Sequence, residues 1–302
     1  MNDTNKVIPK HIQIETINGV CTARCIMCTW PSWTRKPNVM NNITYRKILE
    51  KFKTYRNDIK YLTLHGAGEP LLDKGLAEKV RIAKEMNFKG TGFATNCTEL
   101  DENKSRDLIK AGLDTIICSI DGINKATHES IRIGTNFEEV VSNVQNFIRI
   151  RNESGSTRIM VRFIRQETNK KEWPLFFHYW KSQLNEQFGD EVVKFDVHNW
   201  GGTLDDYQSL DTNKSLGMDN YICQDVFERM LIYSNGEVAL CCAYDNGFFK
   251  MGNVVDSEPI EIFNNEIFTH YRKMMLKGKI LELKHCETCS IPRSRALKIT
   301  ES

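Results

Sequence analysis

Short apolar stretches alternate with longer amphipathic ones from residue 11 to residue 197, and this alternation restricts the fold more than any other feature of the sequence. Six of the apolar stretches are rich in β-branched residues and bounded by turn residues, which is typical of strands. They span residues 11–16, 59–64, 92–95, 115–120, 158–164 and 192–197. Six repeated strand–helix units predict an α/β fold with a parallel sheet, a partial (β/α)6 TIM-like barrel.

The segments between these strands carry apolar residues at helical spacing. Residues 45–52 form the first such segment with Thr44 as its expected cap, and Asp73 is the expected cap of the second. Asn136, followed by Glu139, matches a capping box. Further helices are expected over residues 106–111, 173–184 and 262–275.

The strand–helix alternation stops near residue 205. Residues 201–220 are polar and loop-like, and residues 231–240 predict a hairpin with an Asn235-Gly236 turn. We therefore expect two domains, a barrel over residues 1–205 and a small C-terminal domain over residues 206–302.

Charge and hydropathy exclude several classes of partner. The chain has 302 residues, and 41 Lys and Arg against 39 Asp and Glu give a net charge of +2, so no global field favours nucleic acid or an anionic membrane. The N-terminus lacks the apolar core of a signal peptide, and no apolar stretch approaches the roughly 20 residues that span a bilayer. We expect a cytoplasmic protein, in which cysteines are more often metal ligands or reactive thiols than disulfides.

Cys21, Cys25 and Cys28 form a CxxxCxxC run soon after the first predicted strand. Three thiolates on one loop can hold three irons of a cubane iron–sulfur cluster and leave the fourth iron without a protein ligand. Structural zinc sites prefer four protein ligands, and their cysteine pairs are usually spaced differently. A zinc knuckle and unrelated buried cysteines are the alternatives.

A second group of cysteines lies in the C-terminal part and consists of Cys223, Cys241, Cys242, Cys286 and Cys289. The predicted hairpin brings Cys223 near Cys241, and a helical segment returns the last two cysteines to the same place. Four thiolates meet there in a closed site. Spacing alone fits structural zinc and an iron–sulfur cluster equally well.

Distinctive polar motifs follow four of the predicted strands, at the rim where the chemistry of parallel barrels collects. They are Gly68-Glu69-Pro70, Asn96, Ser119-Ile120-Asp121-Gly122 and His198-Asn199-Trp200-Gly201-Gly202. Each motif alone also suits a turn or a helix cap. Their joint position on one rim favours a functional site.

These motifs together resemble the radical S-adenosylmethionine (radical SAM) superfamily over nearly all of the chain. The likeness rests on the CxxxCxxC run, Gly66-Ala67-Gly68-Glu69-Pro70, Thr95-Asn96 and Ser119-Ile120-Asp121-Gly122. It implies that the amino and carboxylate groups of S-adenosylmethionine chelate the open iron of a four-iron, four-sulfur cluster. An electron from the cluster then yields methionine and a 5′-deoxyadenosyl radical.

The resemblance also implies which residues bind S-adenosylmethionine. They are Ala67, Gly68, Glu69, Asn96, Ser119 and Arg132. Backbone carbonyls and the Glu69 carboxylate would accept from the methionyl ammonium group, which needs acceptors. Ser119 would face the ribose or carboxylate, and Arg132 would make a charge-assisted bond to the carboxylate. Family members often have a second glycine where Ala67 stands.

The C-terminal cysteines resemble the shortened SPASM or twitch extension of this superfamily. The likeness implies one auxiliary four-iron, four-sulfur cluster held by Cys223, Cys241, Cys286 and Cys289. The spacing of four residues after Gly236 favours Cys241 over Cys242 as the ligand. A cluster with four protein ligands would transfer electrons or support the structure.

Three cysteines remain outside the two ligand sets. Cys118 lies in an apolar strand and is expected to be inert packing. Cys97 is expected to point toward the active rim, so Cys97 or Cys242 is a candidate hydrogen-atom donor, which would make the enzyme an epimerase. The simpler reading of both is a small buried thiol.

The resemblance favours oxidation of a sugar or cyclitol alcohol, as in the aminocyclitol (2-deoxy-scyllo-inosamine) dehydrogenase type, with a flavodoxin- or ferredoxin-type reductant. Only about ten residues precede the first strand, so no peptide-recognition domain is seen and a small molecule is favoured over a peptide. Epimerisation and peptide modification are the rivals, and the near-neutral charge disfavours RNA. A non-catalytic iron–sulfur electron carrier would leave the motifs around Glu69, Asn96, Ser119 and Arg132 without a purpose.

Overall fold

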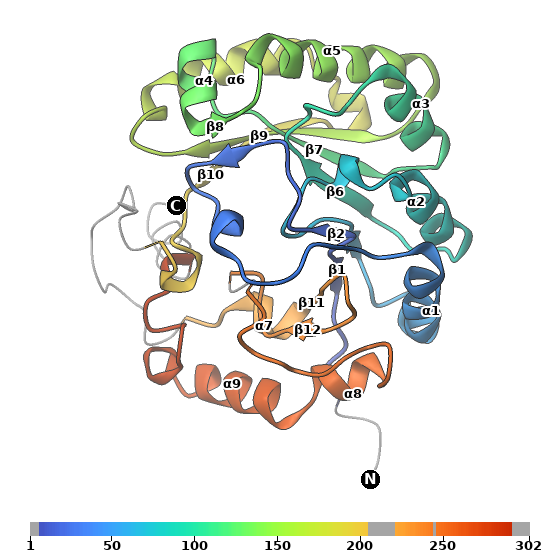
Figure 1. Ribbon diagram of the computed structural model, residues 1–302, viewed down its shortest axis with the longest axis vertical. Coiled ribbons are helices and arrows are strands. Elements are labelled where there is room, and N and C mark those ends of the chain that lie inside the picture. The colour runs from blue at the N-terminus through green and yellow to red at the C-terminus, as the bar shows by residue number, and fades with distance from the viewer. Residues whose placement is uncertain (1–5, 205–220, 244–245, 292–302) are drawn as a thin grey trace.

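One eight-stranded sheet runs through the computed structural model, which describes residues 6–204, 221–243 and 246–291 (Figure 1). Its strands, in spatial order, are β10 (Glu191–Asp196), β9 (Arg158–Arg165), β7 (Thr115–Ser119), β6 (Thr91–Thr95), β5 (Tyr61–Thr63), β1 (His11–Ile14), β11 (Arg229–Ile232) and β12 (Val238–Ala239). All neighbouring pairs are parallel except β11 and β12. The predicted α/β fold with a parallel six-stranded sheet is confirmed.

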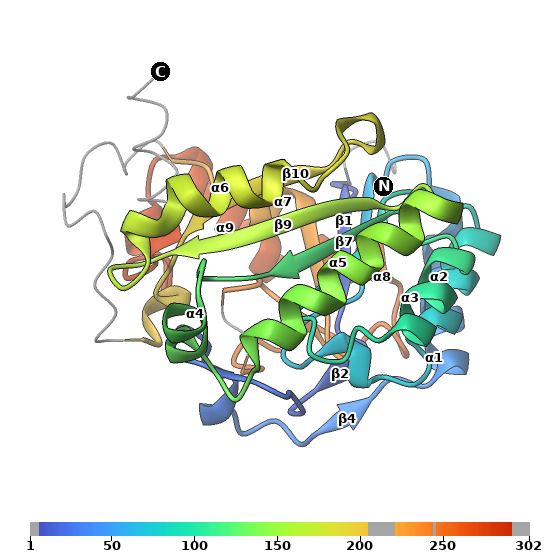
Figure 2. The same ribbon diagram turned by 90° about the horizontal axis from the view of Figure 1, so that it is seen from above.

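Five helices cover the outer face of this sheet (Figure 1 and Figure 2). They are α1 (Asn42–Phe52), α2 (Leu76–Glu85), α3 (Glu102–Lys110), α5 (Phe137–Ser154) and α6 (Trp173–Lys181). Alternate strand residues such as Ile12, Phe93 and Val161 are fully buried against them. The intervening residues therefore face the concave side of the sheet. Among the described helices, none is long and apolar enough to cross a membrane.

The helix starts agree only in part with the predicted caps. Asn136 caps α5 as predicted and accepts a hydrogen bond from the Glu139 amide at 3.0 Å. The prediction for Thr44 is wrong, because Asn41 is the cap of α1 and accepts from the Thr44 amide at 2.8 Å. The prediction for Asp73 is also wrong, because its carboxylate instead forms a buried ion pair with Lys79 at 2.8 Å.

The C-terminal helical region differs from the single expected helix. It contains α8 (Pro259–Phe263) and α9 (Glu266–Leu276), and Asn265 caps the second by accepting from the Phe268 amide at 2.9 Å. The short helices α4 (Lys125–Ile131) and α7 (Gln224–Glu228) were not predicted. Both are too short to show a helical period in the sequence.

The C-terminal hairpin is part of the barrel sheet rather than a separate layer. Strand β11 lies parallel to β1, with Arg229 beside His11 and Ile232 beside Ile14. The predicted Asn235-Gly236 turn lies between β11 and β12, and Gly236 has the positive φ of +87° that favours glycine. The expected boundary at residues 205–206 lies at the edge of residues 205–220, which are outside the described part of the chain.

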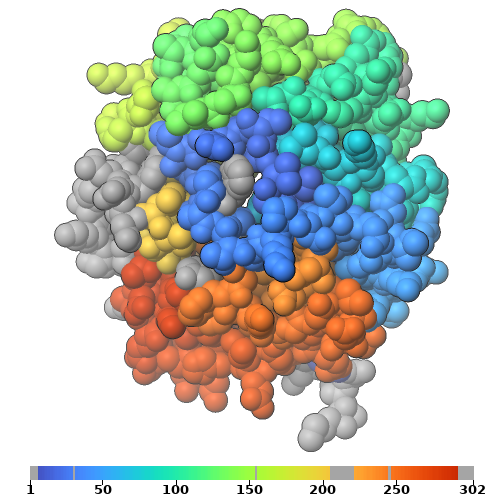
Figure 3. Space-filling view, viewed as in Figure 1, coloured from blue at the N-terminus to red at the C-terminus, as the bar shows by residue number. Residues whose placement is uncertain are grey.

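Two small antiparallel pairs hold the segment that carries the first cysteine run. Strand β2 (Ile17–Asn18) pairs with β4 (Asn38–Val39), and β3 (Arg24–Cys25) pairs with β8 (Arg132–Ile133). In the space-filling view this blue segment lies between the green helices and the orange C-terminal segment (Figure 3). The chain after β1 is thereby laid across the carboxyl ends of the parallel strands.

A buried ion pair links α5 to the strands beside it. The Arg151 side chain is fully buried, and its guanidinium donates to Asp190 at 2.8 Å and to the Thr157 carbonyl at 2.6 Å. The Asp190 carboxylate also accepts from the Ile159 amide at 2.8 Å, at the start of β9. A buried ion pair of this kind makes each partner depend on the other.

Replacing Asp190 with alanine is expected to lower the free energy of unfolding by ~3–5 kcal/mol, because the Arg151 charge stays buried without its carboxylate. Urea unfolding followed by circular dichroism measures this loss. Arg149→Ala is the matched control on the same helix, since its pair with Glu153 is about half exposed and should contribute ~1 kcal/mol or less. Equal losses in the two variants would contradict this assignment.

Candidate functional site

The first cysteine run is surrounded by hydrogen-bond donors from three parts of the chain. The Cys21 sulfur accepts from the Ala23 amide at 3.4 Å and lies 3.6 Å from Asn96 Nδ2. The Cys25 sulfur lies 3.6 Å from Arg132 Nη1, because Cys25 in β3 is directly opposite Arg132 in β8. Burial raises the pKa of Cys21 to about 11 and raises that of Cys25. A metal that displaces these protons gains thiolates whose charge the donors stabilise.

The loop after β5 is built against the segment that leads to Cys21. The Ala67 carbonyl accepts from the Gly19 amide at 2.8 Å, and the Glu69 amide donates to the Val20 carbonyl at 2.9 Å. A Cβ on Gly68 would lie 2.9 Å from two backbone carbonyls, those of Ile17 and Val20, so only glycine fits there. The motif and the cysteine loop therefore fix each other's position.

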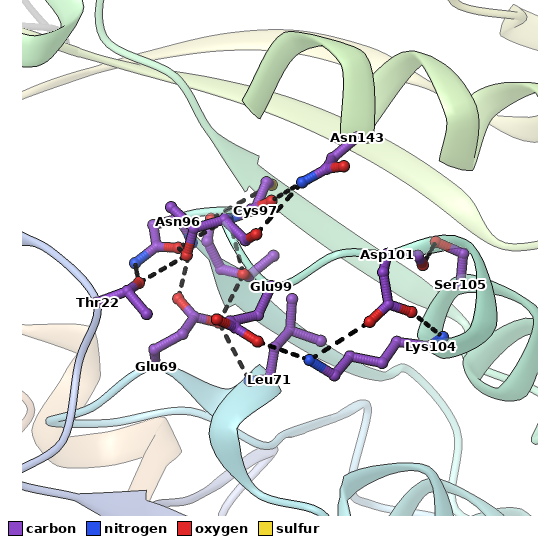
Figure 4. Close-up of polar contacts among 12 residues, drawn as sticks. Thr22, Glu69, Leu71, Asn96, Cys97, Glu99, Asp101, Lys104, Ser105 and Asn143 are labelled. Carbon is purple, nitrogen blue, oxygen red and sulfur yellow. Dashed lines mark hydrogen bonds and ion pairs between the residues drawn. The ribbon is translucent and has the colours of Figure 1, made fainter. Parts of the chain in front are cut away.

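Glu69 is buried and braces the ends of β5 and β6 (Figure 4). One carboxylate oxygen accepts from Thr95 Oγ1 at 2.6 Å and from the Leu71 amide at 3.1 Å, and the other accepts from the Asn96 amide at 2.9 Å. Burial raises the pKa of Glu69, and these donors oppose that rise. Of about four lone-pair sites on a carboxylate, three are used inside the protein. One lone-pair site of the carboxylate is therefore left for the expected contact with a ligand.

Asn96 joins the end of β6 to the cysteine loop. Its Nδ2 donates to Thr22 Oγ1 at 2.9 Å, and its Oδ1 accepts from the Thr98 amide at 3.0 Å (Figure 4). The next residue, Cys97, has a φ of +65° and a fully buried side chain that packs in the core. Burial and the neighbouring Cys118 raise the pKa of Cys97 well above its usual value. The expectation that Cys97 points toward the rim is wrong.

Ser119 and Arg132 both reach the rim but have partners within the protein. Ser119 Oγ accepts from Arg162 Nη2 at 2.7 Å, and Arg132 forms an ion pair with Asp121 at 2.7 Å. Asp121 is fully buried and also accepts from the Ile164 amide at 2.6 Å. Arg132 thus ties the loop after β7 to the cysteine loop through Asp121 and Cys25.

Glu15 is a central site residue that the sequence analysis missed. It follows β1, is 1 % exposed, and accepts two hydrogen bonds from Arg35 at 2.7 Å each. It also accepts from the Ala67 amide at 3.1 Å and from the Ser234 amide at 3.2 Å. The available signal was an acidic residue at the end of a strand, on the face opposite the core residues Ile12 and Ile14.

The second group of cysteines surrounds a small cavity next to α7 and β12. The cysteines that line it are Cys223, Cys241, Cys286 and Cys289. Apolar side chains, including Val226, Leu240 and Phe249, complete the wall. Burial and the neighbouring thiols raise the pKa of Cys241, and they raise that of Cys286 to about 12. The structure thus brings together the four cysteines that the resemblance implied.

Cys242 lies on the other side of the chain from Cys241. Its sulfur is 3.1 Å from Arg229 Nη1 and 3.8 Å from Asp225 Oδ2. It packs against Leu231 and its neighbours on the concave side of the sheet. Cys242 is therefore next to the cavity wall but is not part of it.

The two donor sets consist of thiols, the usual protein ligands of iron–sulfur clusters. A zinc ion needs its ligand atoms within about 2.3 Å of one point. Within the described residues, no three His, Cys, Asp or Glu side chains are arranged closely enough to hold a single metal ion. Four thiols around one cavity, and a run of three in which Cys21 and Cys25 lie beside donors, suit iron–sulfur clusters.

The loop after β10 connects the two groups of cysteines. Trp200 donates through Nε1 to the Met27 carbonyl at 2.7 Å, next to Cys28. Asn199 donates from its backbone amide to Ser290 Oγ at 2.8 Å, next to Cys289. This predicted rim motif therefore holds the C-terminal cysteines against the barrel.

Comparison with known families matches both parts of the chain. A model described as the radical SAM superfamily matches residues 16–166, and a model described as an iron–sulfur cluster-binding domain, SPASM, matches residues 223–290.

Several solved structures share the fold, each at 20 % sequence identity or below. They include BtrN in complex with AdoMet and 2-DOIA (TM-score 0.65, 20 % identity, 94 % of each chain covered). Native anSMEcpe with bound AdoMet is also similar (TM-score 0.65, 17 % identity, 93 % of this chain and 88 % of that one). Streptococcus suis SuiB bound to precursor peptide SuiA matches over 95 % of this chain and 71 % of its own (TM-score 0.64, 14 % identity).

Curated relatives include enzymes named "Probable GTP 3',8-cyclase". That of Methanococcus maripaludis is 30 % identical over 112 residues, 37 % of this chain and 36 % of its own length. That of Saccharolobus islandicus is 25 % identical over 187 residues, 62 % of this chain and 56 % of its own length. The chain thus spans about a third to just over a half of these relatives.

Glu15→Gln is expected to lower the free energy of unfolding by ~3–5 kcal/mol, because the Arg35 guanidinium, only 11 % exposed, keeps its charge and loses its carboxylate. Chemical denaturation measures the loss. The double variant Glu15→Gln/Arg35→Met should be more stable than Glu15→Gln alone, since it removes the stranded charge. Glu50→Gln, an exposed acid on α1, is the control, and a double variant less stable than Glu15→Gln would contradict the role of this pair.

Proposed function

The chain belongs to the radical SAM superfamily and carries a SPASM domain, and from this premise we propose that it oxidises a sugar or cyclitol alcohol. S-adenosylmethionine and four-iron, four-sulfur clusters are its cofactors. The observation that carries the proposal is the cavity lined by Cys223, Cys241, Cys286 and Cys289, a complete set of four thiolate ligands. The match to BtrN over 94 % of both chains supports the same arrangement of parts.

Cys21, Cys25 and Cys28 would hold the cluster that binds S-adenosylmethionine. When bound there, the cluster and S-adenosylmethionine together supply a 5′-deoxyadenosyl radical that can take hydrogen from an unactivated C–H bond. The carbonyl of Gly68 and the remaining lone pair of Glu69 would accept from the methionyl ammonium group. Ser119 and Arg132 would orient its carboxylate, as charge-assisted donors do.

The chain's own residues shape the space beside the first cysteine run. Met27, directly before Cys28, packs with Ile131 and Val197 in a small apolar cluster at the rim. This cluster excludes water from one side of the cysteine loop. The reaction also needs the substrate C–H bond held next to the radical carbon, because other nearby C–H bonds and thiols would compete as sources of hydrogen.

After hydrogen abstraction, oxidation of an alcohol to a carbonyl releases one further proton to a base and one further electron to an acceptor. A site with four protein ligands has no open position for substrate and therefore suits electron transfer. Arg229 begins β11 on the concave side and lies near enough to Cys223 and Cys241 for their charges to act on it, so this site would be beside the substrate. A flavodoxin- or ferredoxin-type protein would supply the electron for the first cluster.

Epimerisation is the second candidate, because Cys242 has its thiol on the concave side and can donate a hydrogen atom. Peptide modification is the third, since SuiB, bound to its precursor peptide, shares the fold. The relatives named as GTP cyclases align over 37–62 % of the chain, and this supports a common barrel more than a common substrate. A non-catalytic electron carrier leaves the residues around Glu69 and Asn96 unexplained.

Anaerobically reconstituted protein with dithionite is expected to convert S-adenosylmethionine to 5′-deoxyadenosine, measured by chromatography. Cys25→Ala should abolish this reaction because one of three cluster ligands is lost. Cys118→Ala is the control, since Cys118 is a buried core residue and the variant should stay active. Continued cleavage by Cys25→Ala would refute the assignment of the first cluster.

A dehydrogenase and an epimerase differ in what they do to the product. In deuterated water the proposed dehydrogenase gives a product that has lost two hydrogen atoms and carries no deuterium at the reacting carbon. Mass spectrometry of candidate sugars and cyclitols measures both changes. Cys242→Ala should keep the oxidation; a product with deuterium and an unchanged oxidation level would rule out the dehydrogenase.

A further inference from the structure

Three nitrogen-containing side chains face the concave side of the sheet from different strands. Arg162 lies in β9 between the core residues Val161 and Phe163, and Arg229 begins β11 at the other end of the sheet. His65 follows β5, in the middle of the sheet order. A barrel that curls its sheet brings such residues toward a common interior.

Arg162 has no carboxylate partner among the described residues. Its guanidinium donates to Ser119 Oγ at 2.7 Å, and its Nε is buried with no hydrogen-bond partner in the described part of the chain. Burial lowers the pKa of Arg162 to about 10, and the nearby Arg132 adds to this effect, while the charge of Asp121, already paired with Arg132, opposes it. A serine hydroxyl cannot neutralise a buried cation, and buried arginines are normally paired with anions.

Three other largely buried arginines make the contrast clear. Arg132 is paired with Asp121 at 2.7 Å, Arg151 is paired with Asp190, and Arg35 is paired with Glu15. Each of these three fixes one element to another. Arg162 is also largely buried, but no carboxylate among the described residues accepts a hydrogen bond from it, so its unpartnered Nε is available to a ligand.

His65 and Arg229 add donors to the same region. His65 Nδ1 is buried with no hydrogen-bond partner among the described residues, and Arg229 Nε is likewise unpartnered within them. Burial, and then the charges of Arg162 and Arg229, lower the pKa of His65 to about 3, so both arginines act on the same ring. Arg229 is partly neutralised by Asp225 at 3.1 Å, which leaves Arg162 as the stronger anion-binding group.

We propose that Arg162, with His65 and Arg229 around the concave face, binds an anionic group of the substrate, a carboxylate or a phosphate. The planar fork of arginine matches both groups with two parallel hydrogen bonds. The substrate class is then an acidic sugar or cyclitol derivative rather than a neutral polyol. This inference rests on the proposed function in taking the concave face as the substrate site.

Inorganic phosphate is the probe for this site, and its ³¹P line width reports binding to the oxidised holoenzyme saturated with S-adenosylmethionine. Wild-type enzyme should broaden the line saturably, and Arg162→Gln should weaken the apparent affinity at least about tenfold, the effect of losing one charged hydrogen bond. Arg162→Lys should retain part of the affinity because it keeps the charge. Arg158→Gln, on the same strand but paired with Glu191 in a partly exposed position, should bind as wild type does.

Three results would overturn the proposal. They are the absence of saturable broadening with wild-type enzyme, equal binding by wild type and Arg162→Gln, and broadening by enzyme without S-adenosylmethionine that the saturated enzyme lacks. The last would assign Arg162 to the carboxylate of S-adenosylmethionine. Phosphate binding needs no radical chemistry, so its failure in an enzyme that still forms 5′-deoxyadenosine leaves the proposed function standing.

Competition against phosphate then separates the two sources of negative charge. Displacement by glucose 6-phosphate alone assigns a phosphate, and displacement by glucuronate alone assigns a carboxylate; either supports the proposal. Displacement by neutral glucose at the same concentrations as the charged sugars would contradict it.

Discussion

The Glu15 carboxylate is the interaction on which the arrangement of the site depends. It lies at the end of β1, between β5 and β11 in the sheet order, and it is 1 % exposed. A buried carboxylate is costly unless its acceptor sites are filled. Here Arg35, Ala67 and Ser234 fill them, and they come from the segment after the cysteine run, the loop after β5 and the turn after β11. The need to neutralise one charge therefore positions three segments that are far apart in the sequence. Gly66 completes this fit, because a Cβ there would lie 2.7 Å from the Glu15 side chain.

Much of the barrel could be predicted because the sequence patterns of its strands and helices lie within short stretches of the chain. Buried parallel strands read as apolar runs, and the cap at Asn136 is visible in four consecutive residues. The pairing of β11 with β1 could not be predicted in this way. It joins residues such as His11 and Arg229, and parallel pairing between distant segments leaves no local pattern. The role of Glu15 was missed for the same reason, because its partners Ala67 and Ser234 lie in the loops after β5 and β11, far from it in the sequence.

The direction in which individual side chains point also could not be predicted from the sequence. Cys97 follows a rim residue, but its φ of +65° turns the side chain into the core beside Cys118. Cys241 and Cys242 are adjacent, so the spacing after Gly236 gave only weak grounds for choosing Cys241 as the cluster ligand. The backbone after β12 directs the first to the four-cysteine cavity and the second to Arg229. Of the two thiols first considered as hydrogen donors, Cys242 alone keeps a position on the concave side.

The distribution of charge within the barrel differs from the charge of the whole chain. A net charge of +2 over 302 residues indicates no strong field outside the molecule. Inside, Arg132 is neutralised by Asp121, whereas Arg162 has only the Ser119 hydroxyl as a partner among the described residues. An average over the chain cannot reveal such an excess, because it adds exposed and buried charges together. The ligand meets the local field, since the low dielectric of a buried site strengthens it and solvent screens it less. On our proposal, Arg162 is therefore a better guide to the charge of the substrate than the net charge of the chain.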